Sequence, residues 1–187
     1  MAPAPPEASV TALLARAREG DDAALDSAFV AVYEELKRAA RLQLRRSHDA
    51  VDTTVLVHEA YLKLTGNTPL PAVDRNHLLA LSARAMRQVL VDHARHAQAQ
   101  KRGSGEAALT LTANLGVEAA AVVDVLALEG LLGNLQRIDS RAAQIVELRY
   151  FGGYSEPEIA GMLGISESTL SRDWRKARAF LFSELSA

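Results

Sequence analysis

Apolar residues recur every three or four positions along most of the chain, a spacing typical of helices that bury one face. No stretch alternates apolar and polar residues for long enough to build a sheet. The pattern therefore predicts an all-α fold. The predicted helices cover residues 10–20, 22–46, 51–65, 76–99, 139–151, 156–163 and 167–185, and a further helix begins near residue 117.

Composition changes between the two groups of predicted helices. Residues 101–105 are basic and rich in glycine, and from Gly103 to Gln136 every charged side chain is acidic. We place a linker in the first half of this stretch. Prolines at 69 and 71 predict a loop over residues 68–75. The sequence thus predicts two small helical domains joined by a flexible linker.

Length and charge narrow the class of protein. A chain of 187 residues with 49% hydrophobic residues can bury a core, and its net charge of -2 excludes a uniformly basic nucleic-acid coat. The chain has no Cys and no apolar run near the roughly 20 residues of a membrane span. Residues 1–9 lack the features of a signal peptide, so we expect a cytoplasmic protein.

The last predicted helices carry the signals of a helix-turn-helix. Ser155 and Glu158 form an S-x-x-E capping box, and Ser166 is positioned to cap the final helix. Ala160 is small where two helices approach closely. Gly164 lies where the turn requires a positive φ. Together these positions predict a short helix followed by a recognition helix, rather than an ordinary helical hairpin.

The predicted recognition helix exposes hydrogen-bond donors suited to a DNA major groove. Trp174 lies between Leu170 and Ala177 on the apolar face, so we expect it to pack in the core. The expected DNA contacts on the opposite face are Ser168, Thr169, Ser171, Arg172 and Arg175.

Three motifs occur in a characteristic order: LVHEAYLKL at 56–64, SARAMRQVLVDHAR at 82–95, and S-x-x-x-R-D-W at 168–174. With them the chain resembles the extracytoplasmic-function (ECF) branch of the sigma-70 family over about residues 10–185. The resemblance implies that domain 10–97 binds core RNA polymerase and melts the minus-ten element. It also implies that 98–121 is the linker and that domain 122–187 reads the minus-thirty-five element of promoter DNA.

Individual residues follow from the same resemblance. The helix over 51–65 would dock on the polymerase through Asp52, His58, Glu59, Leu62 and Lys63, although Leu62 has the alternative of lying in the core. The minus-ten strand would be captured by Asn76, His77, Arg84, Arg87, Arg95 and His96, with the arginines exposed. Two alternatives exist for a further partner that controls the protein: an anti-sigma factor or a Ser/Thr kinase.

One departure from the family concerns the acidic cluster that many members carry before the polymerase-binding helix. Here the row is Asp52-Thr53-Thr54-Val55. Phosphorylation of Thr53 or Thr54 would restore about -1.5 to -2 charges, which we state as a hypothesis for switching polymerase binding on. The alternative is that one of these threonines caps the helix.

Two other classes compete with a sigma factor. A stand-alone helix-turn-helix regulator would bind DNA without polymerase. An enzyme is disfavoured, because His58-Glu59 begins a zincin motif whose second His is replaced by Leu62. Asp92, His93 and His96 are more typical of surface residues than of metal ligands. The sequence therefore predicts a protein without enzymatic activity, metal or cofactor.

Overall fold

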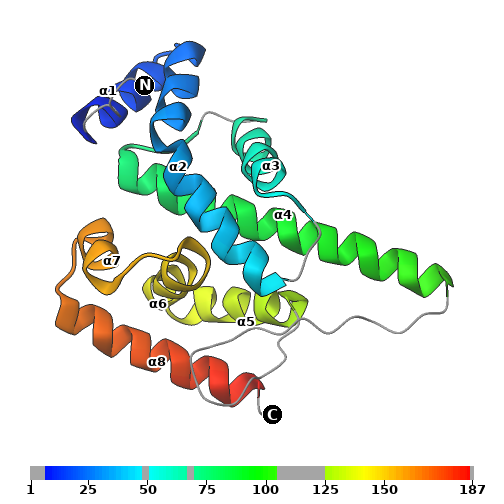
Figure 1. The fold of residues 1–187 in the computed structure, drawn as a ribbon. Coiled ribbons are helices and arrows are strands. Elements are labelled where there is room, and N and C mark those ends of the chain that lie inside the picture. The colour runs from blue at the N-terminus through cyan, green and yellow to red at the C-terminus, as the bar shows by residue number, and fades with distance from the viewer. Residues whose placement is uncertain (1–6, 48–50, 67–69, 105–124, 186–187) are drawn as a thin grey trace.

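The computed structural model describes residues 7–47, 51–66, 70–104 and 125–185. Within these ranges the chain is helical with short connections and contains no strand, which confirms the all-α prediction (Figure 1). The elements are α1 Glu7–Arg18, α2 Asp22–Ser47, α3 Thr53–Thr65, α4 Arg75–Ser104, α5 Val125–Ile138, α6 Ser140–Val146, the π-helical turn η1 Glu147–Gly152, α7 Glu156–Leu163 and α8 Glu167–Leu185.

Short polar residues set the beginnings of the early helices. Gly20, at φ 97°, ends α1, and the Asp21 carboxylate then accepts the backbone N–H of Ala24 at 3.1 Å. The Asp52 carboxylate caps α3 by accepting the N–H of Thr54 at 2.7 Å, a bond that lowers the pKa of Asp52. The expectation that a threonine caps α3 is therefore wrong, because the residue before the two threonines occupies the cap.

Helices α1 to α4, here called the N-terminal unit, bury one apolar face each. Leu36 of α2, Leu56 of α3 and Met86 of α4 are almost fully buried in a shared core. On α2, Phe29 and Val32 are buried as the helical spacing predicts, whereas Tyr33 is exposed and has the Lys37 ammonium near its ring. α4 continues to Ser104, beyond the predicted end at residue 99.

Helices α5 to α8 with η1, here called the C-terminal unit, have a second apolar cluster. It joins Leu132 of α5, Val146 of α6 and Leu181 of α8. The helix predicted over 139–151 is observed as α6 followed by η1, which ends at Gly152, with Gly153 in the left-handed conformation at φ 71°. The helix start expected near residue 117 and most of the linker expected over 98–121 lie outside the described residues.

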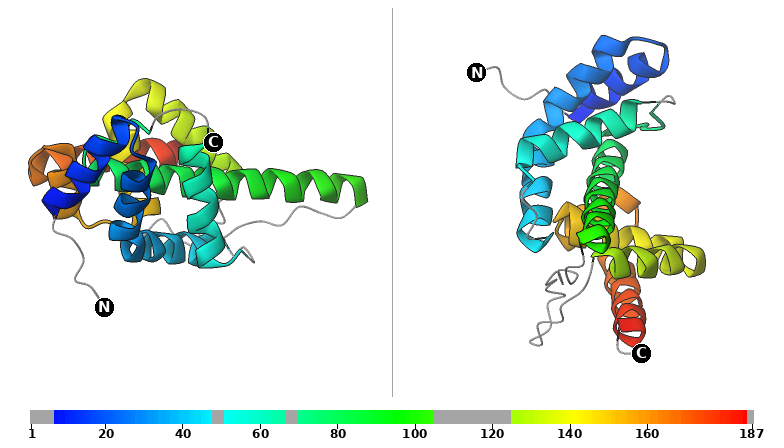
Figure 2. Two further views of the ribbon diagram at one scale, coloured as in Figure 1. Left: turned by 90° about the horizontal axis from the view of Figure 1, so that it is seen from above. Right: turned by 90° about the vertical axis from the view of Figure 1, so that its right-hand side faces the viewer.

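The two units lie against each other. η1 packs on both α2 and α4, and α5 packs on α4 (Figure 1). The C-terminal part of α4 extends beyond the rest of the fold, as Figure 2 shows from above. In the part of the chain that is described, no helix has the length and hydropathy needed to cross a membrane.

Candidate nucleic-acid interface

The helix-turn-helix is built by α7, a tight turn and α8. At the start of α7 the Ser155 N–H and Oγ both donate to the Glu158 carboxylate at 2.7 Å, and the backbone bond lowers the pKa of Glu158. Gly164 turns the chain at φ 63°. Ser166 Oγ accepts the N–H of Thr169 at 3.2 Å. The predicted capping box, positive φ and second cap are all confirmed.

A buried ion pair fixes α8 on α6. The Asp173 side chain is 1% exposed, and its Oδ2 lies 2.6 Å from Nη2 and 2.8 Å from Nε of Arg141. Leu170 and Ala177, one turn to either side, are fully buried on the same face. Asp173 is not among the predicted site residues, although an acid at the apolar spacing of α8 is a recognisable sign of a buried pair.

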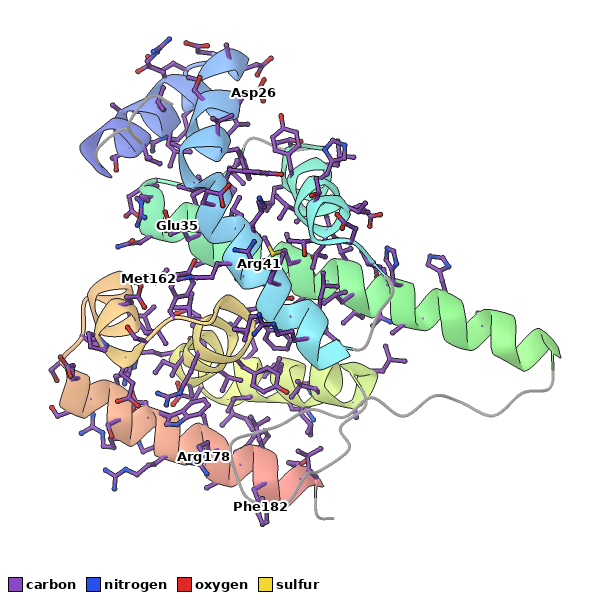
Figure 3. All side chains as sticks on the ribbon, viewed as in Figure 1. Asp26, Glu35, Arg41, Met162, Arg178 and Phe182 are labelled. Atoms are coloured by element: carbon purple, nitrogen blue, oxygen red, sulfur yellow. The ribbon has the colours of Figure 1, made fainter. Side chains whose placement is uncertain are left out.

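The opposite face of α8 is open and cationic. Ser168, Arg172 and Arg175 follow each other by four and three positions, and all three are exposed, Arg172 by 57%. Thr169 and Ser171 are partly buried beside them. The structure thus gathers the predicted donors on one side of the helix. Two further exposed cations of α8 were not predicted, Lys176 and Arg178, the second of which is labelled in Figure 3.

Trp174 has the packing role that its spacing predicts. It is partly buried and touches both apolar clusters of the molecule. The Arg149 guanidinium lies 4.6 Å from its ring centre, a cation–π contact between η1 and α8. Trp174 therefore holds the helix against its support rather than presenting its ring to DNA.

The candidate polymerase contacts lie on α3 and are of two kinds. His58 and Leu62 are exposed, Leu62 by 52%, so the alternative that Leu62 lies in the core is wrong. Glu59 and Lys63 are instead tied to α4, through His93 at 2.9 Å and Asp92 at 2.5 Å.

Asp92 and His93 of α4, the metal ligands weighed from the sequence, form the ion pairs with α3 just described. His93 faces Glu59, and Asp92 faces Lys63 and, at 3.6 Å, Arg95. Among the residues that the structure describes, no three His, Asp or Glu side chains converge as a metal site would require. These contacts give the two residues a structural role in holding α3 on α4.

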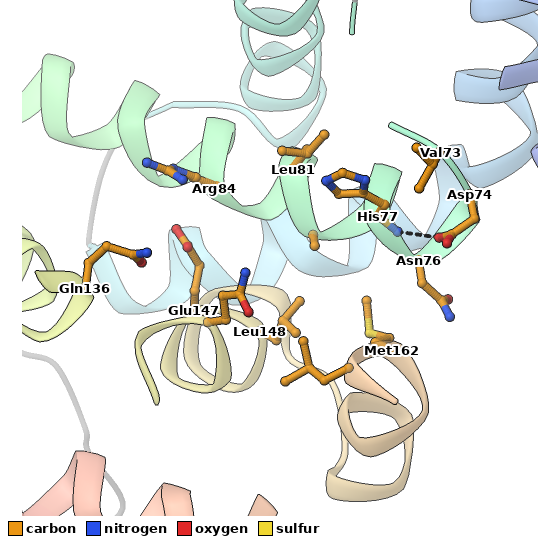
Figure 4. A pocket seen from close by; sticks show the side chains of 13 residues that line it. Val73, Asp74, Asn76, His77, Leu81, Arg84, Gln136, Glu147, Leu148 and Met162 are labelled. Carbon is orange, nitrogen blue, oxygen red and sulfur yellow. Dashed lines mark hydrogen bonds between the residues drawn. The ribbon is translucent and has the colours of Figure 1, made fainter. Parts of the chain in front are cut away.

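Three of the minus-ten candidates share a cavity between the two units. Asn76, His77 and Arg84 line it from α4, and Glu147 and Met162 line it from η1 and α7 (Figure 4). The cavity has a volume of about 320 Å³. Asp74 caps α4 at its rim by accepting the N–H of His77 at 2.8 Å. The other two exposed candidates, Arg95 and His96, lie farther along α4.

Arg87 departs from the prediction that it is exposed. It is 7% exposed, donates from Nε to Glu147 at 2.9 Å and forms a second ion pair with Glu129. Its guanidinium also lies 5.7 Å from the ring centre of Phe151. Since its partners lie 42 and 60 positions farther along the chain, the local apolar spacing gave no sign of this burial.

These features define an all-helical protein that ends in a helix-turn-helix, a unit typical of DNA-binding transcription proteins. The family model described as ECF sigma factor matches residues 7–187, nearly the whole chain, so the protein belongs to the ECF sigma factor family. Searches of curated proteins and of solved structures each gave no match. The family confirms the resemblance and gives the chain a role in transcription initiation.

Proposed function

We propose that this chain binds core RNA polymerase and directs it to promoters. The observation that carries the proposal is the exposed cationic face of α8, held at a fixed position by Asp173 and Arg141. On this proposal residues 10–97 contact polymerase and the minus-ten element, and residues 122–187 read the minus-thirty-five element. Residues 98–121 form the linker between these two domains. The polymerase supplies the phosphoryl-transfer chemistry, and this chain supplies recognition.

At the minus-thirty-five element, the first two turns of α8 enter the major groove. Arg172 and Arg175 suit guanine edges or phosphates, because a guanidinium donates two parallel hydrogen bonds. The hydroxyls of Ser168, Thr169 and Ser171 add donors and acceptors within the same two turns. The dipole at the start of α8 also favours a nearby phosphate.

At the minus-ten element, residues of α4 and the loop before it hold the separated strand. Asn76 and His77 offer hydrogen bonds to an extruded base, while Arg84, Arg95 and His96 follow the backbone. No aromatic residue occurs from Pro69 to Arg102. Base capture therefore depends on polar contacts rather than on stacking.

The polymerase contact lies on the exposed side of α3. Leu62 and His58 present an apolar and a polar contact one turn apart. Asp52, Glu59 and Lys63 border them. The hypothesis that Thr54 is phosphorylated gains support from its exposure beside Asp52. A kinase or an anti-sigma factor would then control the protein in the cytoplasm, where polymerase and promoters are found.

Affinity purification with core polymerase tests the proposal. A tagged chain should retain core enzyme, and Leu62→Asp should abolish retention because it places a charge in an apolar contact. Ile138→Asp is a matched control, since Ile138 is 71% exposed and lies at the end of α5, which carries none of the proposed polymerase contacts. Tight binding to duplex DNA without retention of polymerase would instead indicate a stand-alone regulator.

A further inference from the structure

Two arginines of α6 and η1, which follow each other without a break, reach neighbouring residues of α8. Arg141 pairs with Asp173 at 2.6 Å, and the guanidinium carbon of Arg149 lies 4.6 Å from the ring centre of Trp174. Consecutive residues of an α-helix point about 100° apart around its axis. The two arginines therefore hold α8 from two directions on the same turn.

Arg149 also contacts the other helix of the helix-turn-helix. Its Nη1 forms an ion pair with Oε1 of Glu156, the first residue of α7. The same guanidinium thus binds α7 through a carboxylate and α8 through the Trp174 ring. The position of the recognition helix relative to its shorter neighbour consequently depends on one side chain of η1.

The direction of Arg149 depends on the π-helical geometry of η1. A π turn closes i→i+5 hydrogen bonds in place of i→i+4 bonds, so it takes one residue more and redirects the side chains within it. Gly153, at φ 71°, follows the turn directly and leads the chain towards α7. Arg149 therefore points in a direction that a regular continuation of α6 would not give.

The charge of Arg149 is satisfied within the protein. Its side chain is 33% exposed, against 57% for Arg172 on the open face of α8. A guanidinium that already has a carboxylate and an aromatic ring as partners needs no phosphate to neutralise it. Arg149 therefore acts on DNA through the two helices that it holds, and Arg172 acts by direct contact.

Recognition of a base demands a more exact helix position than attraction to the DNA backbone. Hydrogen bonds to a base edge form only within narrow limits of distance and angle, whereas contacts to phosphates carry no sequence information. Resting on the proposed function, we propose that Arg149 is a positioning residue for minus-thirty-five recognition. It holds α8 where Arg172 reaches base edges, so its loss should cost discrimination between sequences rather than attraction to DNA.

Transcription from paired promoters tests this role. A promoter obtained with core polymerase from a genomic library is compared with the same promoter after replacement of its minus-thirty-five element. The ratio of their transcripts is the discrimination ratio. Arg149→Gln should lower this ratio about tenfold, the size of one lost base contact, while transcription from the altered promoter stays unchanged. Arg149→Lys should recover part of the ratio, because an ammonium keeps both contacts without the planar stack.

Two control variants separate positioning from charge and from stability. Arg137→Gln removes an exposed cation of α5, and Ile145→Val removes one methylene from a fully buried side chain of α6. The first changes charge alone, and the second lowers stability without removing a hydrogen bond or a charge. Both should keep the ratio at temperatures where the chain is folded. Equal losses of the ratio in Ile145→Val and Arg149→Gln would reduce Arg149 to a structural role and overturn the proposal.

Trp174 measures the contact directly, because it is the one tryptophan of the chain. Acrylamide should quench its fluorescence more strongly in Arg149→Gln, which uncovers the ring, and equally in Arg137→Gln and the unmodified chain. Glu156→Gln should lower the discrimination ratio less than Arg149→Gln does. Together the two changes should cost no more than Arg149→Gln alone, since both act through one contact. Additive losses would contradict the shared contact.

The two proposals fail differently. Equal losses of transcription from both promoters in Arg149→Gln, with a weaker dependence on salt, would make Arg149 a phosphate contact and overturn the positioning role. An unchanged ratio would overturn it as well. A chain that gives no transcripts with core polymerase contradicts the proposed function instead. The discrimination ratio is then measured on duplex DNA that the chain binds alone, and Arg149→Gln should lower it in the same way.

Discussion

Arg141 of α6 and Asp173 of α8 form an ion pair of 2.6 Å in which the carboxylate is buried and the guanidinium is about half exposed. Because only the acid is buried, the arginine remains hydrated while Asp173 fixes the rotation of α8 about its axis. Arg172, the residue before Asp173, is exposed, with its Nε 3.6 Å from the same carboxylate. The pair thus links packing within the C-terminal unit to the orientation of the DNA-facing side chains.

Removal of the buried acid should destabilise the helix-turn-helix. We expect Asp173→Ala to lower the free energy of unfolding by about 1–3 kcal/mol, since it deletes a charge-assisted hydrogen bond whose other partner can still reach water. Denaturant unfolding of the full chain measures the change. Glu184→Gln should remain within about 0.5 kcal/mol of the unmodified chain. Equal stabilities for both variants would show that the pair contributes nothing.

Loss of one exposed cation should affect promoter use and leave stability unchanged. Arg172→Ala is expected to reduce transcription by roughly 5- to 150-fold, corresponding to about 1–3 kcal/mol for a bidentate base contact. Arg137→Ala on α5 is the matched control, because it removes an exposed cation of the same unit whose hydrogen-bond partner, Asn134, lies on its own helix rather than on α8. Binding to core polymerase should be unaffected. A loss of core binding by Arg172→Ala would mean that the two functions are assigned to the wrong units.

The capping box predicts a pH dependence at the start of α7. Hydrogen bonds from Ser155, together with the nearby Arg38, lower the folded-state pKa of Glu158 below 4.5. The stability from this depressed pKa is present above pH 4.5 and is lost as pH falls through the folded value. Glu158→Gln should therefore lose stability at neutral pH and show a shallower decline below pH 4.5. Parallel pH profiles of the two proteins, followed by thermal unfolding, would contradict this account.

Because Asp52, and not a threonine, caps α3, the phosphorylation hypothesis can be tested by variants of Thr54 that keep the cap. Because Asp52 caps the helix through the backbone N–H of Thr54, Thr54→Ala leaves the cap in place. If phosphorylation activates, Thr54→Glu should raise core binding above Thr54→Ala, since the partner would meet an added negative charge. Asp52→Ala removes the cap alone and should lower the free energy of unfolding by about 1 kcal/mol. Equal binding by the two Thr54 variants removes the hypothesis.

Sequence alone predicted the features that depend on neighbours along the chain. Ser155, Glu158 and Gly164 form the expected cap and turn because each acts within a few residues. Arg87 escaped prediction, since its burial depends on partners 42 and 60 positions away. For Asp173 the apolar spacing of α8 indicates the buried position, but its partner Arg141 lies 32 positions away. The π-helical geometry of η1 was equally invisible, because apolar spacing does not distinguish it from the end of an ordinary helix.

The central proposal gives core polymerase and the minus-ten element to the N-terminal unit, and the minus-thirty-five element to the C-terminal unit. Run-off transcription with purified core polymerase and a genomic library tests it directly. We predict transcripts that begin at a defined set of promoters, require the chain, and become scarce with Arg172→Ala. Identical transcripts with and without the chain, from a protein that binds duplex promoter DNA unaided, would contradict the account.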